Sequence, residues 1–330
     1  MKNNTNNLSQ TNIVDYLARF KALLLLIVLC AFTTIMTDRF LTASNITNVL
    51  RQVAISTVLA VGYTMIIAAG CIDLSVGSVI GFCCIVMGRL MHIDGYPTFA
   101  VFLAGMLLGV LCGVVNCLIF IKFKLPPFIV TLGMSQVYKG LTQILSRGTP
   151  ITNLHPAAVF VGQGYIFKIP VPIILMAVVV IIGAVFLSKS IWGRKLLAVG
   201  SNRDAAYVCG INVGKMVLLA YSLVGLAAGI AAIIFNGRAA SAQPTAGGGM
   251  EMDAIASVVI GGTQMGGGHG NVFGTLIGCV LVGVINNALN LMNVSPYWQM
   301  VAKGLLIILA VILDSLTERL RERRAQNTAG

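Results

Sequence analysis

The sequence has few charged residues for its length. Of its 330 residues, 10% are charged and 57% are hydrophobic, and the mean hydropathy is +0.92. A soluble domain carries about 25% charged residues. Because so few charges cannot cover a solvated surface, most of the exterior is expected to face lipid. We expect one integral membrane domain with no appended soluble module.

The sequence also lacks the pattern of a nucleic-acid-binding surface. Its net charge is +12, but basic and aromatic residues are not interleaved along any polar stretch. The cations form short clusters at the ends of apolar runs, where positive-inside topology places them. The charge therefore indicates orientation in a membrane, and a nucleic-acid partner is not expected.

Residue patterns for catalysis are missing as well. The eight cysteines show no CxxC or Cys/His ligand spacing, and all except Cys209 lie within or at the edges of apolar runs. No Ser/His/Asp or paired-carboxylate arrangement is present, and "GINVGKM" lacks the P-loop spacing. We therefore expect no enzyme activity, no metal site, no disulfide framework and no cofactor bound by this chain.

Long apolar runs are the main feature that is present. A membrane-spanning helix needs about 20 mostly apolar residues. Ten candidates lie near 20–37, 49–69, 73–91, 98–122, 126–146, 169–188, 215–236, 253–263, 271–292 and 297–314. The first has no small-residue cleavage site after it, so we expect a retained helix. The eighth is too short to cross alone and ends in "GGTQMGGGHG", which we interpret as irregular backbone along the wall of a pathway.

The positions of the cations predict the orientation. With the N-terminus inside, most Lys and Arg residues fall on the cytoplasmic side: Lys2, Arg19, Lys21, Lys122, Lys124, Lys189, Arg194, Lys195, Arg203, Lys215, Arg319, Arg321, Arg323 and Arg324. The domain organisation is then a cytoplasmic tail at 1–19, a membrane domain at 20–314 and a second cytoplasmic tail at 315–330. Both termini are expected in the cytoplasm.

Two segments of the chain repeat. Residues 110–116 read "VLCGVVN" and residues 280–286 read "VLVGVIN", so five of the seven residues are shared. In each case a proline, Pro126 or Pro296, follows ten residues after the Asn. The fourth predicted helix runs inward and the ninth runs outward. Matching segments of opposite direction predict inverted-topology repeats, whose interface often holds the path of a transporter.

A short charged segment separates two of the apolar runs. Residues 193–215 read "GRKLLAVGSNRDAAYVCGINVGK". This segment carries a cap, an acidic first turn, helix-forming alanines and a glycine stop: Ser201 or Asn202, Asp204, Ala205, Ala206 and Gly210. We predict a cytoplasmic helix of two or three turns. Small residues on a helix suit a docking surface, although an ordinary polar connector is the other interpretation.

Polar residues inside the apolar runs form a second candidate site. Asp73 can cap the start of the third helix with Ser75 in its first turn, or it can form a polar gate with Ser75 and Ser78. Asn116 corresponds to Asn286 in the repeat, and Asn286, Asn287 and Asn290 lie within one turn of a helix. These amides either bond between helices or line a path for a hydroxyl-rich solute.

The charges expected in the outer loops are few. They are Arg89, Asp94, Arg147, Arg238, Glu251 and Asp253. These residues either dock an extracytoplasmic protein or are simply solvated, and His92 and His155 are expected to be solvated with them.

These motifs resemble those of one transporter family. "GRKLLAVGSNRDAAYVCGINV" and "AGCIDLSVGSVIG" are similar to the signatures of ribose-type sugar permeases of ATP-binding-cassette importers. The segments "SAQPTAGGGMEMDAIASVVIGGT" and "GTLIGCVLVGVINNALNLMNVSPYWQ" resemble the C-terminal third of that family. The likeness runs from Asn45 to Asp314. Two positions depart from the pattern, since Cys71 replaces a glycine and His269 replaces another polar residue.

The resemblance implies an all-α, ten-helix permease whose cytoplasmic segment is a coupling helix for a separate ATPase. The residues that it assigns to coupling are Asn202, Arg203, Asp204, Ala205, Ala206, Gly210 and Ile211. It also implies an extracytoplasmic sugar-binding protein, a second permease subunit of the same or another chain, and ribose or a similar monosaccharide as substrate. An ion-coupled secondary transporter and a non-transporting membrane scaffold are the other hypotheses.

Overall fold

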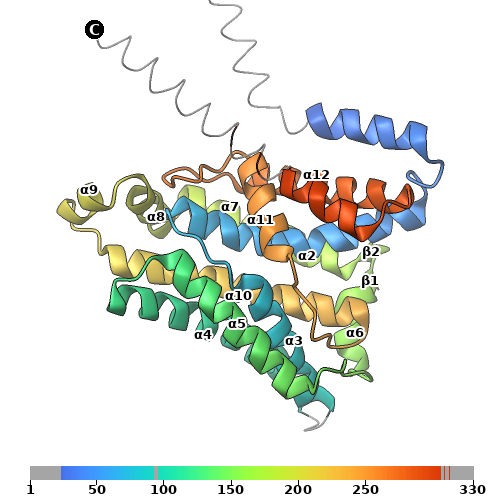
Figure 1. Ribbon diagram of the computed structural model, residues 1–330, viewed down its shortest axis with the longest axis horizontal. Coiled ribbons are helices and arrows are strands. Elements are labelled where there is room, and N and C mark those ends of the chain that lie inside the picture. Colours follow the sequence, from blue (N-terminus) through green and yellow to red (C-terminus); the bar gives the residue numbers. More distant parts are fainter. Residues whose placement is uncertain (1–23, 93–95, 306–307, 309–311, 313–330) are drawn as a thin grey trace, which may run out of the picture.

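The computed structural model describes residues 24–92, 96–305, 308 and 312. Within this part the chain is mostly helical (Figure 1). A helix at Leu24–Met36 precedes the labelled elements. These are α2 (Ala43–Ala68), α3 (Val76–His92), α4 (Thr98–Phe123), α5 (Pro127–Ser146), α6 (Pro156–Gln163), β1 (Tyr165–Ile166), β2 (Ile169–Pro170), α7 (Val171–Lys189), α8 (Ile191–Ser201), α9 (Arg203–Val208), α10 (Val213–Ala239), α11 (Met250–Ile260) and α12 (Val272–Leu291).

The helix ends follow local chemistry. Ser190 accepts a hydrogen bond from the backbone N–H of Gly193 at the start of α8. Asn202, Asn212 and Asn271 cap α9, α10 and α12 in the same way, each accepting from a backbone N–H three residues later. Helices α5, α6 and α7 each have a proline at their first or second position, where its missing N–H costs nothing.

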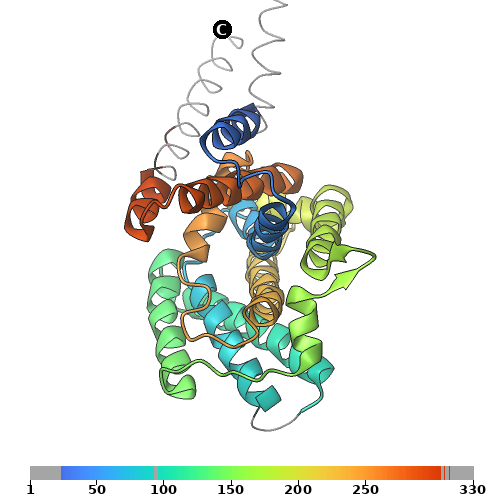
Figure 2. The ribbon, with the colours of Figure 1, turned by 90° about the vertical axis from the view of Figure 1, so that its right-hand side faces the viewer.

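Helices α2 and α10 form the centre of the molecule. Helix α10 packs on α2 and on α4, and α3 also packs on α10. On the other side, α11 and α12 both pack on α2 (Figure 2). The contact between α4 and α10 is glycine-mediated, because a Cβ at Gly109 would collide with the carbonyl oxygen of Gly225 and a Cβ at Gly225 with that of Gly109. The two backbones therefore touch.

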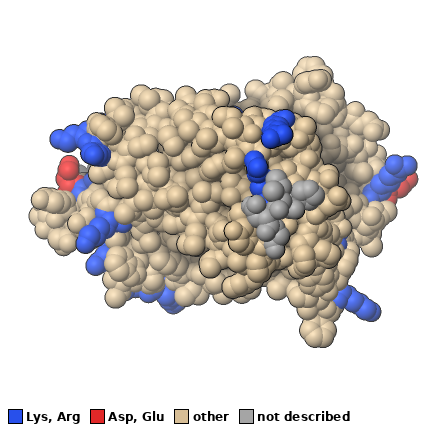
Figure 3. All heavy atoms as spheres, turned by 90° about the horizontal axis from the view of Figure 1, so that it is seen from below, with Lys and Arg blue, Asp and Glu red and all other residues tan. Residues whose placement is uncertain are grey.

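Five of the helices are long and apolar enough to cross a membrane: α2, α4, α7, α10 and α12. Many large apolar side chains on them and on their neighbours point outward, such as Phe99 at 79% exposed and Ile182 at 63%. In Figure 3, uncharged side chains cover most of one face, and Lys and Arg lie mainly toward its two ends. An exterior of this kind is what lipid requires of a multi-pass membrane protein.

The helices overlap the predicted spans. The five long helices coincide with the candidates near 49–69, 98–122, 169–188, 215–236 and 271–292. The candidates near 20–37, 73–91, 126–146 and 253–263 also correspond to helices, and residues 296–305 are helical at the start of the tenth. The predicted tails at 1–19 and 315–330 lie outside the described residues. The sequence did not predict α6, the β1–β2 hairpin or α8.

The glycine-rich segment after α11 serves close packing. Gly268 donates its backbone N–H to the carbonyl of Ala68 at the end of α2, at 2.9 Å. A Cβ at Gly200, near the end of α8, would collide with that same carbonyl oxygen, and a Cβ at Gly267 would lie 2.7 Å from the carbonyl oxygen of Gly200. Backbone from α2, α8 and this loop thus meets at one junction. In this conformation the segment packs its glycines against the ends of α2 and α8.

Candidate functional site

Helix α9 is the predicted docking segment, and it lies at one end of the molecule (Figure 1). Asn202 caps it by accepting from the N–H of Ala205 at 2.9 Å. The helix has six residues, shorter than the predicted two or three turns, because its last turn closes at Cys209 and Gly210 adopts a left-handed φ of +79°. Its side chains are exposed except that of Ala206. The backbone N–H of Ile211 bonds back to the carbonyl of Ala206.

The side chain of Arg203 joins α9 to the segment between α2 and α3. Its Nη2 donates to the carbonyl oxygen of Gly70 at 3.1 Å and to the Sγ of Cys71 at 3.0 Å. Gly70 has a φ of +69°, so the chain turns there in a conformation that glycine adopts without strain. Cys71 is thus a contact of α9.

Two residues beyond Cys71, Asp73 is held in a buried hydrogen-bond network. Its Oδ1 accepts from the backbone N–H and the Oγ of Ser75, at 2.8 and 2.6 Å. The Nδ2 of Asn116 on α4 lies 3.1 Å from Oδ2 of Asp73 and 2.7 Å from Oγ of Ser75. Tyr138 on α5 donates to Oδ1 of Asn116 at 3.0 Å. The network links the start of α3 with α4 and α5.

This network lies at the start of α3. The Asp73 carboxylate accepts from the backbone N–H of Ser75, the residue directly before α3, and so forms an Asx turn that leads into the helix. Asp73 is 1% exposed, and Ser75 and Asn116 are fully buried, so none of the three faces an open path in this conformation. Two backbone carbonyls nearby also accept hydrogen bonds from tyrosines. Tyr221 donates to the carbonyl of Ile72, and Tyr63 donates to the carbonyl of Asp73. Tyr138 and the two other tyrosines were not among the predicted site residues.

The three asparagines of α12 lie apart from this network. Asn287 exchanges two hydrogen bonds with Asn45 of α2, at 2.9 and 2.7 Å. Asn290 accepts from Gln299, and Asn286 is buried with its Oδ1 unpartnered in the described part of the chain. The predicted path residues therefore divide between two places. Asn287 and Asn290 bond to neighbouring segments, which is the simpler of the two interpretations of these amides.

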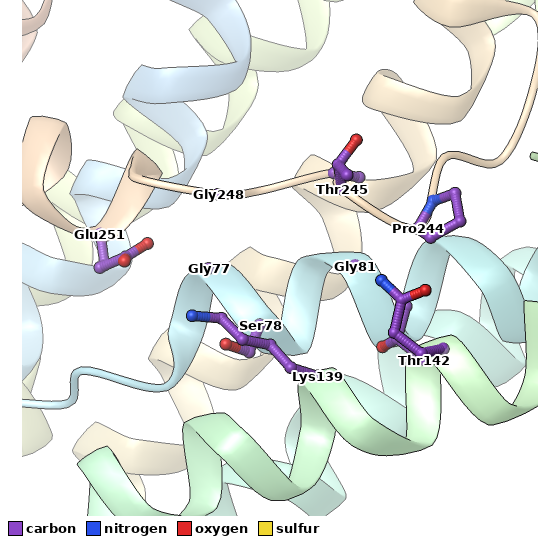
Figure 4. Close-up of a pocket in the computed structure, with 11 residues that line it drawn as sticks. Gly77, Ser78, Gly81, Lys139, Thr142, Pro244, Thr245, Gly248 and Glu251 are labelled. Atoms are coloured by element: carbon purple, nitrogen blue, oxygen red, sulfur yellow. The ribbon is translucent and has the colours of Figure 1, made fainter. Parts of the chain in front are cut away.

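A half-open cavity of about 260 Å³ lies between α3, α5 and the segment that leads into α11 (Figure 4). We call it the polar cavity because six of its lining residues carry polar side chains. Ser78 is the predicted residue that lines it. The others that carry polar groups are Lys139, Thr142, Gln143, Thr245 and Glu251. Lys139 was missed because its only signal in the sequence is that of a single cation inside an apolar run.

Two acids expected in the outer loops lie instead in the first turn of α11. Glu251 lines the polar cavity. Asp253 pairs with Lys303 at 2.9 Å, and this is the ion pair that the described part of the chain contains. The prediction was wrong for both because α11 begins at Met250, three residues before the expected start, after the positive φ of Gly249 at +78°.

A second cavity, of about 200 Å³, lies between α2, α7 and α10. Its walls are apolar, with Met65, Ile182, Phe186 and Leu223 among them. It offers no partners for a polar solute, so it is not a candidate for a sugar path.

A mostly helical chain with an apolar exterior and several helices long and apolar enough to cross a membrane is a multi-pass membrane protein. The comparison with known families gives the particular kind: residues 45–311 match the model of the branched-chain amino acid transport system / permease component, so the chain belongs to this family of transport permeases. It is therefore a transport subunit and not an enzyme.

Relatives with assigned roles cover nearly the whole chain. It is 39% identical to the ribose import permease protein of Haemophilus influenzae, over 96% of this chain and 98% of the relative. It is 42% identical to the ribose import permease protein of Bacillus subtilis, over 88% and 90%. It is 34% identical to the D-allose transport system permease protein of Escherichia coli, over 90% and 91%. No solved structure shows a significant match.

Proposed function

We propose that this chain is the membrane permease subunit of an ATP-driven, binding-protein-dependent sugar importer. Relatives at 39% and 42% identity are named as ribose import permease proteins, and a third is named for D-allose. The substrate class is therefore ribose or a similar monosaccharide. The chain binds no cofactor of its own, and ATP is used by a separate ATPase subunit.

The observation that carries this proposal is the contact of Arg203 with Gly70 and Cys71. A separate ATPase can move membrane helices only through an element that it holds and that is attached to them. Helix α9 offers exposed small and polar side chains for such a contact, and its arginine reaches the segment that leads into the Asp73 network. The coupling residues are Asn202, Arg203, Asp204, Ala205, Ala206, Gly210 and Ile211.

The orientation proposed places α9 in the cytoplasm of a bacterium, at its inner membrane. Seven exposed cations lie at the C-terminal ends of α4 and α7, on α8 and α9, and at the start of α10: Lys122, Lys124, Lys189, Arg194, Lys195, Arg203 and Lys215. This clustering supports positive-inside insertion with ten helices and both termini in the cytoplasm. The packing of α3 and α4 on α10, and of α11 and α12 on α2, supports the inverted repeat.

A second permease subunit is part of the proposal. Helix α5 carries Gln136 on an exposed face, and an amide facing lipid is costly. At Gly133 and Gly140 an added Cβ would meet no atom within 4 Å, so a second backbone has room to approach. A second copy or a paralogous chain placed against α5 would cover this face. The extracytoplasmic binding protein is then expected at the end opposite α9.

The proposed path and gate residues are Asp73, Ser75, Ser78, Asn116, Asn286, Asn287 and Asn290. In this proposal Ser78 contacts the path directly. Asp73, Ser75 and Asn116 act one layer behind it, by holding the start of α3 against α4 and α5. Movement of the Gly70–Cys71 segment with α9 would then shift the start of α3.

Reconstitution tests the proposal. The purified chain in proteoliposomes, with the ATPase and binding protein encoded beside it, is expected to take up D-ribose with ATP and to fail when the ATPase is omitted. An ion-coupled transporter would give the reverse pattern: uptake without the ATPase that collapses with a protonophore. Residues 193–215 are expected to react with membrane-impermeant labels from the cytoplasmic side, and labelling from outside would overturn the orientation.

A further inference from the structure

The polar cavity between α3 and α5 has walls of unlike chemistry. Ser78 on α3 and Thr142 on α5 contribute hydroxyls, and Gln143 contributes an amide that both donates and accepts. Lys139 and Glu251 point toward the same space from α5 and α11 (Figure 4). The lining has no large aliphatic or aromatic side chain among its 11 residues.

Glycine on α3 gives the cavity its shape. A Cβ at Gly77 would collide with Oε2 of Glu251, and a Cβ at Gly81 would lie 2.9 Å from the carbonyl oxygen of Ala246. Residues 244–251 therefore run close along α3 only because these positions have no side chain. The same absence leaves the Glu251 carboxylate room beside the helix.

The two charges of the cavity are left for a ligand. Oε2 of Glu251 is buried and has no hydrogen-bond partner within the residues that the structure covers. Lys139 makes no ion pair with Glu251, because its side-chain nitrogen is not within 4.0 Å of either carboxylate oxygen of this described residue. An unpaired buried carboxylate oxygen is costly. A hydroxyl group satisfies both charges at once, because it donates to Oε2 and accepts from an ammonium.

The size and lining select the ligand class. Pockets for drug-sized ligands enclose about 300–1,000 Å³, so a cavity of about 260 Å³ suits a ligand about as large as one sugar ring. A branched-chain amino acid would satisfy the two charges with its carboxylate and ammonium. Its side chain would then find only small apolar neighbours such as Pro244 and Ala246, with no large aliphatic or aromatic side chain to pack against.

We propose that this cavity is a binding site for one monosaccharide in transit, with Glu251 accepting and Lys139 donating hydrogen bonds to sugar hydroxyls. This inference rests on the proposed function, because it places the sugar of that importer. It adds a specific site within each permease subunit, made by Ser78, Lys139, Thr142, Gln143 and Glu251.

Substrate protection of a cysteine tests the site. Gln143 is exposed at the cavity, so in Gln143→Cys the new thiol is open to alkylation. The full chain in lipid nanodiscs is alkylated with and without D-ribose, and peptide mass spectrometry follows each thiol. Native Cys209, exposed on the coupling segment, is the internal control. D-ribose is expected to slow alkylation of the introduced thiol only, and sucrose and L-leucine at equal concentration are expected to have no effect.

Two acids of α11 give matched variants. Adding Glu251→Gln is expected to raise the half-protecting ribose concentration by about tenfold, because a hydrogen bond to a charged group contributes about that factor to binding. Adding Asp253→Asn, which alters the neighbouring acid paired with Lys303 outside the cavity, is expected to leave it unchanged. Protection by sucrose or leucine, or an equal effect of both variants, would overturn the site. Absent protection alongside ATP-driven ribose uptake would overturn the site and leave the proposed function standing.

Discussion

Removal of the Arg203 side chain is expected to weaken coupling without disturbing the fold. The guanidinium makes two hydrogen bonds, to the Gly70 carbonyl and to Cys71 Sγ. A hydrogen bond that involves a charged group contributes about 1.5–3 kcal/mol net. Because the side chain is exposed, water replaces part of this, and we expect Arg203→Ala to cost about 1 kcal/mol, a factor of roughly five in the equilibrium that keeps α9 docked.

The assay for this change is the number of sugar molecules taken up per ATP hydrolysed, measured in proteoliposomes that contain the whole importer. The ratio is expected to fall several-fold in Arg203→Ala, while the amount of inserted protein stays constant. Arg203→Lys is expected to be intermediate, because lysine keeps the positive charge but its shorter side chain does not place a nitrogen where Nη2 donates to both acceptors.

Lys215→Ala is the matched control. It removes a cation from the same end of the molecule, and the Lys215 side chain makes no hydrogen bond or ion pair among the described residues. Its coupling ratio is expected to stay at the wild-type value. Equal losses in Arg203→Ala and Lys215→Ala would show that only the net charge matters, and an unchanged ratio in Arg203→Ala would refute the role given to the contact.

Three further predictions concern stability and coupling. Gly200→Val is expected to lower the free energy of unfolding in detergent by about 1–3 kcal/mol, because the valine side chain would strike the backbone of α2. Its control is Gly140→Ala, whose added Cβ meets no neighbour within 4 Å, and this variant is expected to leave the melting temperature of the single subunit unchanged. Asn116→Ala is expected to cost about 1–3 kcal/mol in the same assay, because Oδ2 of Asp73 then stays buried without its amide partner; an unaltered melting temperature would argue against the network. Ala205→Trp is expected to abolish ATP-driven uptake with normal insertion, because the side chain is exposed on the face offered to the ATPase, and normal uptake by this variant would remove α9 from the mechanism.

Hydrophobic runs and cap chemistry were enough to predict most of the helices. The five long helices fall on predicted runs because a lipid-facing helix must be apolar along its whole length. The cap at Asn202 follows equally directly from a side-chain oxygen placed before a helical segment. Helix α8 was missed because it is too short to span a membrane and carries Gly193, Gly200 and two cations, so a search for long apolar runs does not find it.

Contacts between distant segments could not be predicted. The Arg203–Cys71 contact joins residues 132 positions apart, and the Tyr138 bond to Asn116 crosses between two helices. Single-sequence patterns carry no information on such pairs. The polar cavity was missed for the same reason, since Lys139 and Glu251 belong to different helices and neither belongs to a motif. The roles of Asn286, Asn287 and Asn290 stayed open for the same reason, because the sequence does not show which residues they contact.

The glycine contact between α4 and α10 limits how the protein can move. Gly109 and Gly225 are in backbone contact, and Phe120 of α4 packs on Tyr221 of α10 with 5.3 Å between the ring centroids, so the two helices are held closely together at both places. Only four residues separate the end of α9 at Val208 from the start of α10 at Val213. A displacement of α9 must therefore carry α10 and α4 together as one rigid body. The hinges of a transport cycle are then expected where that body meets α2, α3 and α5.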